Sequence, residues 1–505
     1  MNDWLLANRT VYGLINVRTD GTKVVMGALK VIRVIISVGG VHAMNDFANS
    51  RFKSLAVSLS GGGHRATLFV LGTLMYLVDA KANAHVTSIA SVSGGSLTNG
   101  FVGQTLNFRE TDGSEFRKRV AGPLATQIAK SGTLFAPLFT KVYLLVLIAG
   151  ALLVLAIPAI VSGPWYVRLL LFFVGLTVWG WLFGARGRVC ARAFRITLFS
   201  ANSRETTLRE LKKTDLDHVI CATEFRSAEQ VYFSGEFVYS YALGYGGPAE
   251  LSLARAVQAS AAFPGGFPPA TLPTKQHKFT GAPPPIAGGP PNPPAEMVLT
   301  DGGVYDNMGE QWARGFAARV KRCPSLGTGR TDPNQLVVVN ASARIPWIPF
   351  RKRLIPLIGE LAALIRVNNV LYINTTNVRR QAIVDSYNPA DPATASALPS
   401  ALVQIAQSPF VVASAFANGT TAVAERAKRV LEFLMNGPTS DEWTKIAREN
   451  SAVATSLSKI GTEVSARLIY QGYVVTMCNL HVLFGTDFPL LPEALAIERF
   501  RELIR

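Results

Sequence analysis

Apolar runs of strand length recur along the chain and are separated by glycine-rich turns. Such runs cover residues 55–59, 86–92, 297–300 and 336–340, and the first two are each followed by helix-like sequence. A strand followed by a loop and a helix is the repeating unit of α/β proteins. The pattern therefore predicts an α/β fold with an open sheet and flanking helices.

Two apolar runs are too long for strands. Residues 142–161 carry no charged side chain, and a turn at 162–166 leads to a second uncharged run at 169–185. A helix of about 20 residues, at about 1.5 Å per residue, crosses a bilayer core of about 30 Å. We therefore predict an inserted two-helix transmembrane hairpin. The alternative is a pair of fully buried core helices.

Basic residues flank this hairpin and orient it. The turn between the two runs holds only Arg168. The flanks hold Arg117, Lys118, Arg119, Lys130, Lys141, Arg186, Arg188, Arg192 and Arg195. By the positive-inside rule both flanks, and the domain attached to them, lie on the cytoplasmic side.

A first glycine-rich segment, residues 60–65, lies between a strand-like and a helix-like run. Its sequence is Ser60-Gly61-Gly62-Gly63-His64-Arg65. Glycines allow backbone N–H groups to turn toward one point, and a helix start adds a positive dipole end. We expect Gly61, Gly62, Gly63, His64 and Arg65 to form an oxyanion loop, with the N–H groups of Gly62, Gly63 and His64 as donors.

A second segment places Ser93 at a bend between a strand at 86–92 and a helix that begins near Gly94 or Gly95. A serine at such a turn projects from the top of the sheet, and small neighbours such as Ser91, Gly94 and Gly95 are needed to avoid clashes. Ser93 is therefore a candidate nucleophile. An ordinary helix-capping serine is the alternative.

A third segment, Asp301-Gly302-Gly303, ends the apolar run 297–300. Active sites of open α/β sheets gather at strand ends, and the glycines Gly302 and Gly303 allow the chain to turn away sharply. Asp301 is therefore a candidate base. The alternative is an Asp that only forms a turn.

Together and in this order, the three segments resemble the patatin-like phospholipase family, whose pattern is G-G-G-x-R/K, G-x-S-x-G and D-G-G/A. The resemblance extends over roughly residues 53–345, with further agreement at 219–224 and 259–269. It implies a three-layer α/β/α fold and a catalytic dyad of Ser93 and Asp301 without histidine. One position departs from the pattern: Ser91 stands where the family has glycine.

Two residues of the first loop have alternative roles. His64 would be the general base of a Ser–His–Asp triad, although the family leaves this position free. Arg65 supports the oxyanion loop in the family, whereas at the start of a helix it would pair with any nearby acid. Neither alternative is excluded by the sequence.

The composition of the chain limits the classes of molecule that it is expected to bind. Among 505 residues 16% are charged, and the formal net charge is +17, as expected of a protein that rests on anionic lipid. No nucleic-acid-binding signature accompanies this charge. The four cysteines lack C-x-x-C spacing, and neither a metal nor another cofactor is implied.

The chain divides by composition into five parts. We predict an N-terminal arm (1–52) with a basic amphipathic run at 24–38, the two halves of the α/β domain (53–130 and 201–345), the hairpin with its basic flanks (131–200), and a mainly helical C-terminal region (346–505). In the last region, Thr439 and Glu442 form a capping-box pattern for a helix through about residue 457. A proline- and glycine-rich stretch at 264–294 is a mobile lid, a plain exposed loop or a PPII ligand for a partner.

These features lead to one main hypothesis, a membrane-anchored serine lipid acyl hydrolase with its catalytic domain on the cytoplasmic side. Its partners would be a phospholipid or other acyl-ester lipid and the bilayer, with oligomeric or regulatory partners undefined. The alternatives are a non-catalytic patatin-like membrane scaffold and an acyltransferase that uses the same serine.

Overall fold

The computed structural model describes residues 54–504 except 202–203, 212–214, 282–293, 343–355, 386 and 388–397. The predicted N-terminal arm, with its amphipathic run, lies outside the described residues. So does much of the proline- and glycine-rich stretch, of which the described part contains a short strand at Ala270–Pro273.

The strands of the described chain are β1 (Leu55–Leu59), β2 (Val86–Val92), β3 (Ser200–Ala201), β4 (Arg204–Glu205), β5 (Asp217–Glu224), β6 (Glu229–Phe233), β7 (Val238–Ser240), β8 (Gly244–Gly246), β9 (Ala270–Pro273), β10 (Glu296–Asp301), β11 (Gln335–Asn340) and β12 (Ser400–Gln404). All four strand-like runs predicted from the apolar pattern are confirmed within one residue at each end.

The helices are α3 (Gly63–Asp79), α4 (Gly94–Thr105), α5 (Gly113–Phe116), α6 (Gly122–Lys130), α7 (Leu138–Ile160), α8 (Trp165–Gly184), α9 (Arg186–Thr197), α10 (Leu253–Ser260), α11 (Gly303–Asp306), α12 (Gln311–Arg314), α13 (Phe316–Arg322), α14 (Pro356–Asp385), α15 (Phe410–Phe416), α16 (Ala422–Leu434), α17 (Ser440–Ala452), α18 (Thr462–Phe484) and α19 (Glu498–Arg501).

One mixed sheet organises the described chain, in the order β12-β11-β1-β2-β5-β6-β7-β8. The strands from β12 to β5 are parallel, whereas β6, β7 and β8 continue antiparallel. β10 pairs antiparallel with β5 and carries β9 on its other side. The sheet is therefore parallel at its centre and antiparallel at one end.

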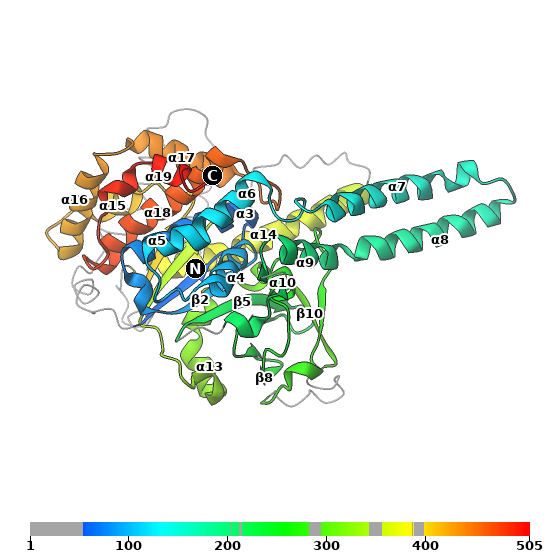
Figure 1. Cartoon of the computed structure of the whole chain (residues 1–505), viewed down its shortest axis with the longest axis horizontal. Coiled ribbons are helices and arrows are strands. Elements are labelled where there is room, and N and C mark those ends of the chain that lie inside the picture. The colour runs from blue at the N-terminus through cyan, green and yellow to red at the C-terminus, as the bar shows by residue number, and fades with distance from the viewer. Residues whose placement is uncertain are drawn as a thin grey trace, which may run out of the picture.

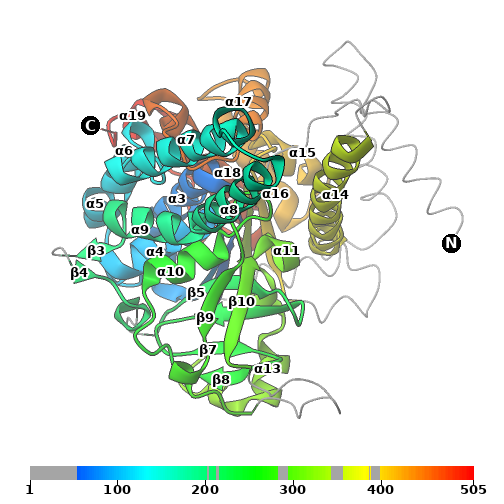
Figure 2. The same ribbon diagram turned by 90° about the vertical axis from the view of Figure 1, so that its right-hand side faces the viewer.

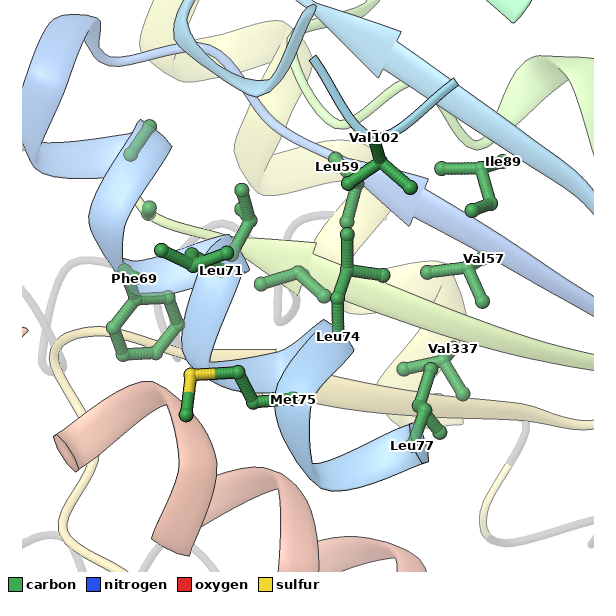
Figure 3. Close-up of a cluster of buried hydrophobic side chains, with 14 of the residues drawn as sticks. Val57, Leu59, Phe69, Leu71, Leu74, Met75, Leu77, Ile89, Val102 and Val337 are labelled. Carbon is green, nitrogen blue, oxygen red and sulfur yellow. The ribbon is translucent and has the colours of Figure 1, made fainter. Parts of the chain in front are cut away.

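Helices cover both faces of this sheet, which confirms the three-layer α/β/α fold. On one face Val57, Leu59 and Ile89 pack against α3 and α4 (Figure 3). On the other face Ala90 and Val92 pack against Trp312 of α12. The alternation along each strand follows from the two-residue period of a pleated sheet.

The C-terminal region is mainly helical, as predicted, but it shares the core of the α/β domain. β12 extends the sheet beside β11, and α18 packs along α3. The Thr439–Glu442 capping box is present and starts α17. That helix ends at Ala452 instead of about residue 457, because the next residues leave the helix to contact the glycine-rich loop at residues 61–65.

The two long apolar helices, α7 and α8, project from the body as an antiparallel pair (Figure 1). α8 has no buried residue, and only Thr140, Leu147 and Val154 of α7 are buried. The alternative of two buried core helices is therefore wrong. Their length and apolar composition are those of helices able to cross a membrane.

The close packing of α3 on α18 depends on two glycines. A Cβ at Gly72 would overlap the carbonyl oxygen of Ile469 and lie 2.7 Å from the backbone nitrogen of Tyr473. A Cβ at Gly472 would likewise overlap the carbonyl oxygen of Phe69. Backbone atoms cannot move aside as a flexible side chain can, so these positions accept only glycine without a shift of the helices.

We expect Gly72→Ala to lower the free energy of unfolding by about 1–3 kcal/mol, the usual cost of overpacking a core. Chemical denaturation of the protein in detergent measures this change in the free energy of unfolding. Gly247→Ala is the matched control, because nothing lies within 4 Å of a Cβ at that position. Equal stability of the two variants would contradict the proposed role of this contact.

Candidate active site

Strand β5 brings Ser93 and Asp301 together. β2 runs parallel to β5 and ends with Val92 opposite Cys221. β10 runs antiparallel to β5 along the same edge and ends with Asp301 opposite Ala222, the next residue of β5. The two strands thus end head to head, and the residues at their ends, Ser93 and Asp301, become neighbours.

Ser93 occupies a strained turn between β2 and α4. Its backbone has φ 49° and ψ −112°, a conformation that L-residues rarely adopt. Its N–H donates to Oγ of Ser260 at 2.9 Å, and the Ser260 hydroxyl in turn donates to the Cys221 carbonyl at 2.6 Å. A non-glycine residue held at positive φ by specific hydrogen bonds is a common feature of functional sites.

The small residues around Ser93 are required by backbone contacts. A Cβ at Gly95 would lie 2.7 Å from the Leu59 carbonyl oxygen, and one at Gly94 would overlap the Gly63 backbone. Ser91, which departs from the family pattern, is accommodated because its hydroxyl points into the core. It donates to the Val219 carbonyl at 3.1 Å and accepts from Asn99 Nδ2 at 2.9 Å.

Asp301 is buried, with 5% of its surface exposed. Its Oδ1 accepts the Gly303 N–H at 2.7 Å, and its carboxyl group also accepts a hydrogen bond from the Ser93 side chain. Burial raises the pKa of the Asp301 carboxyl to about 7, although both hydrogen bonds lower it. A carboxyl with a pKa near 7 is a competent base at neutral pH.

The glycine-rich loop lies against Ser93, and the structure reduces the number of its N–H groups that are free to donate to an oxyanion. A Cβ at Gly61 would lie 3.2 Å from Cβ of Ser93. The Gly61 N–H donates to the Asn307 carbonyl and the His64 N–H to the Ser456 carbonyl, each at 3.0 Å. Among the described residues, the N–H groups of Gly62 and Gly63 have no partner, so these two stay the predicted oxyanion donors.

His64 is a structural residue in this geometry. Its ring is fully buried, with Nδ1 2.8 Å from the Ser458 carbonyl and Nε2 2.9 Å from the Thr133 hydroxyl. Burial lowers its pKa to about 4, so the ring is neutral. Because both ring nitrogens are engaged away from Ser93, the Ser–His–Asp alternative does not fit.

Arg65 supports the loop from inside the protein. Its guanidinium donates to the carbonyls of Ala341, at 3.0 Å, and Val453. Burial lowers its pKa to about 10. No carboxylate of the described chain forms an ion pair with it, so the alternative of an arginine paired with a nearby acid is wrong.

A comparison with known protein families shows to which family a chain with this arrangement belongs. The family model for patatin-like phospholipases matches residues 57–311, half of the chain, and includes all three glycine-rich segments. The chain belongs to the patatin-like phospholipase family. A search of curated proteins found no match.

Solved structures similar to this patatin-like chain include human GIVD cytosolic phospholipase A2, at 13% identity and a TM-score of 0.40, over 95% of this chain and 65% of that one. The same enzyme in complex with methyl gamma-linolenyl fluorophosphonate matches at 13% identity, TM-score 0.37, over 95% and 64%. VipD from Legionella pneumophila matches at 14% identity, TM-score 0.20, over 90% and 92%. The chain thus spans about two thirds of the length of the first two.

Two residues that the sequence analysis missed line the patatin-like site. Asn307 accepts the Gly61 N–H through its carbonyl and donates from Nδ2 to the Ser342 hydroxyl at 2.7 Å. Its Oδ1 is buried without a partner among the described residues and lies beside Gly61 and Gly303. The only available signal was its position shortly after Asp301-Gly302-Gly303.

The second missed residue is Tyr372 of α14. A Cβ at Gly303 would lie 2.7 Å from its Cε2 atom, so the ring covers the turn after Asp301. Burial raises the pKa of this phenol well above its usual value and the Asp301 charge raises it further, whereas Arg65 lowers it. A residue so distant in sequence had no local signal.

A separate cavity of about 970 Å³ lies at the opposite end of the strands. It is lined by residues at the amino ends of β2 and β5, such as Ser88 and Asp217, and by Arg330. It includes neither Ser93 nor Asp301. No cluster of three or more metal-ligating side chains occurs within the described chain.

The raised pKa of Asp301 predicts a pH-dependent stability. The unfolded chain loses this proton near pH 3.8, whereas the folded protein keeps it to about pH 7. Folding therefore becomes less favourable as the pH rises through this window. At about 1.4 kcal/mol per pKa unit the loss reaches at most about 4 kcal/mol.

Chemical denaturation of wild type and Asp301→Asn at pH 4.5 and at pH 8 measures this loss of stability. We expect the wild type to lose stability relative to the variant as the pH rises. A difference that is constant, or of the opposite sign, would contradict a buried carboxyl with a raised pKa.

Proposed function

We propose that this protein is a membrane-anchored serine lipid acyl hydrolase that uses a Ser93–Asp301 dyad. The observation that carries the proposal is the head-to-head meeting of β2 and β10 along β5, with a strained serine at one strand end and a buried, hydrogen-bonded carboxyl at the other. Family membership supports the same reaction class.

In the first half-reaction, Ser93 Oγ attacks the ester carbonyl carbon while its proton passes to Asp301. The negative charge that develops on the carbonyl oxygen is stabilised by the N–H groups of Gly62 and Gly63. Collapse of the tetrahedral intermediate breaks the ester C–O bond, and Asp301 returns the proton to the leaving alcohol. The products are an acyl-Ser93 enzyme and a lysolipid.

In the second half-reaction, Asp301 accepts a proton from water, which attacks the acyl-Ser93 carbonyl. A fatty acid leaves, and Ser93 recovers its proton from Asp301. Transfer of the acyl group to an alcohol in place of water would make the same protein an acyltransferase. The product, free fatty acid or a new ester, separates the two.

Membrane anchoring by α7 and α8 completes the proposal. Their exposed apolar surfaces, the basic residues at their base and the even number of crossings between Ser93 and Asp301 all support a hairpin with both ends on the cytoplasmic side. A hairpin anchor would hold the site at the surface of its lipid substrate.

The test is product release from mixed phospholipid micelles by the purified full-length protein, read by mass spectrometry. We expect fatty acid and lysophospholipid from wild type and a rate at least about 1000-fold lower for Ser93→Ala and Asp301→Asn. Ser325→Ala and Asp332→Asn are matched controls, because both residues are exposed and distant from the dyad. Full activity of Ser93→Ala would contradict the proposal.

The pH dependence of kcat/KM gives a second test. With a base whose pKa is about 7, the rate should rise about tenfold per pH unit below that value and level off above it. A profile that is flat from pH 5 to pH 8 would exclude Asp301 as the base.

A further inference from the structure

Helix α14 is packed on the site at one half and leaves the domain at the other. From Tyr372 onward its inner stripe contacts the protein: Tyr372 covers Gly303, and Thr376 and Ile383 are buried. Before Tyr372, the described side chains Val367 and Leu371 are 52% and 60% exposed. The 16 residues before Tyr372 extend about 24 Å.

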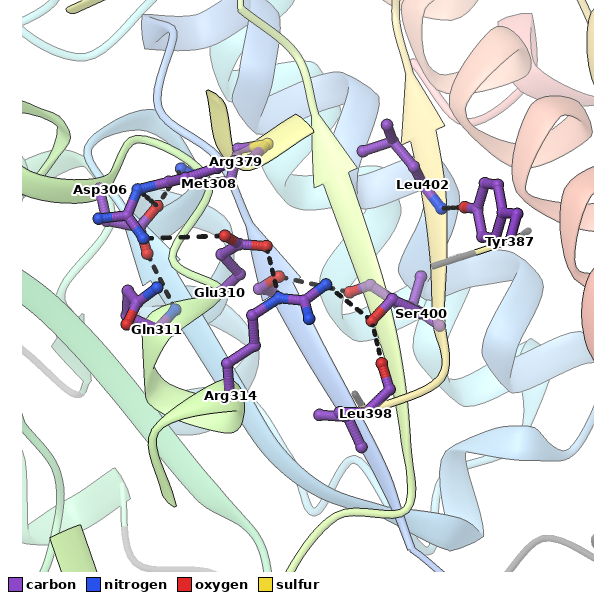
Figure 4. A network of polar contacts seen from close by, with 12 residues as sticks. Asp306, Met308, Glu310, Gln311, Arg314, Arg379, Tyr387, Leu398, Ser400 and Leu402 are labelled. Carbon is purple, nitrogen blue, oxygen red and sulfur yellow. Dashed lines mark hydrogen bonds and ion pairs between the residues drawn. The ribbon is translucent and has the colours of Figure 1, made fainter. Parts of the chain in front are cut away.

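The half of α14 that packs on the site is held there by a charged side chain. The Arg379 guanidinium donates to the Tyr305 carbonyl at 3.2 Å and lies 3.9 Å from Asp306 and 3.7 Å from Glu310 (Figure 4). Both carboxylates are buried. α14 is thus fixed to α11, the helix that follows Asp301 directly.

The free half is apolar in composition. Residues 356–371 contain only two charged residues, Glu360 and Arg366. Val367, Val370 and Leu371 all lie on its exposed surface. A row of exposed aliphatic side chains on a helix that leaves the core indicates a surface for a partner.

The direction of α14 identifies the partner. Figure 1 shows α14 projecting from the same side of the body as α7 and α8, and Figure 2, which looks at that side, shows α14 standing apart from the hairpin. The base of that hairpin carries Lys141, Arg186, Arg188 and Arg192. A bilayer crossed by the hairpin, with anionic headgroups at these basic residues, would meet the free half of α14 as well.

We propose that the N-terminal half of α14 lies in the headgroup region of the bilayer that holds the hairpin, so that the active-site mouth faces lipid between them. Phe263, 46% exposed, follows Ala262, whose carbonyl accepts the Asp301 N–H, and Val304, 40% exposed, lies three residues after Asp301, so exposed apolar side chains also occur close to the site. This inference rests on the proposed function for its membrane and its substrate. It adds a third contact with the lipid, separate from the hairpin.

A fluorescent label tests the contact without catalysis. Val367→Cys in the Ser93→Ala protein is labelled with the polarity-sensitive dye NBD and reconstituted into vesicles of phosphatidylcholine and phosphatidylglycerol. Met435→Cys is the matched control, because Met435 is 77% exposed and caps α16, a helix that lies on the side of the body away from the hairpin (Figure 1). The native cysteines are buried or half-buried.

We expect NBD at position 367 to shift to the blue and to be quenched by a nitroxide-labelled lipid, and NBD at 435 to show neither. An unshifted label at 367 would overturn the inference. A blue shift without lipid quenching would also overturn it, because a second protein copy would then cover the helix. Failure of the proposed function has a different signature, namely no product from wild type while lipid still quenches the label.

The catalytic consequence is tested with Val367→Glu. A negative charge near an anionic surface should lower the rate on phosphatidylglycerol-containing vesicles about fivefold. The rate on a soluble short-chain ester should not change, and Met435→Glu should leave both rates unchanged. An equal loss on both substrates would show a folding defect and would contradict a role confined to the lipid surface.

Discussion

The site depends on the pairing of three strands. β5 offers one continuous edge, and β2 and β10 occupy successive parts of it from opposite directions. Because neither strand can extend past the end of the other, the chain turns away at the same point after each strand, and the two residues at these turns lie side by side. A shift of register by one residue in either strand would move Ser93 or Asp301 to the other face of the sheet.

This pairing of the strands explains why the site lowers the stability of the folded protein. Ser93 is held at positive φ, a strain of about 1–3 kcal/mol, and Asp301 is buried without a cationic partner in the part of the chain that the structure describes. The surrounding contacts offset these costs: the Ser260 hydroxyl satisfies the Ser93 N–H, and Gly61, Gly94 and Gly95 allow the backbones to approach closely. Strain and burial of this kind lower stability, as expected if the two residues have the proposed catalytic roles.

Local sequence was sufficient to predict the strands, the turn at Ser93 and the position of Asp301 at a strand end, because apolar runs and glycines determine these features within a few residues. It was not sufficient to predict which donors of the glycine-rich loop are free. That depends on Asn307 and Ser456, which take up the N–H groups of Gly61 and His64 from distant parts of the chain.

For the same reason, the role of the C-terminal region could not be predicted from the sequence. Its composition predicted helices but gave no indication that β12 would join the sheet or that Tyr372 would cover the turn after Asp301. Contacts of this kind are set by tertiary packing, and one sequence holds no periodic signal for them.

The dyad is connected on both sides to elements that project toward the proposed membrane. On the serine side, α8 leads into α9, α9 packs on α10, and α10 ends at Ser260, which accepts the Ser93 N–H. On the aspartate side, α14 packs on α11, which begins two residues after Asp301. A displacement of either projection by lipid would therefore be transmitted to one partner of the dyad. Since the proposed reaction needs both partners in register, contact with the proposed bilayer would be coupled to the alignment of the proposed nucleophile and base.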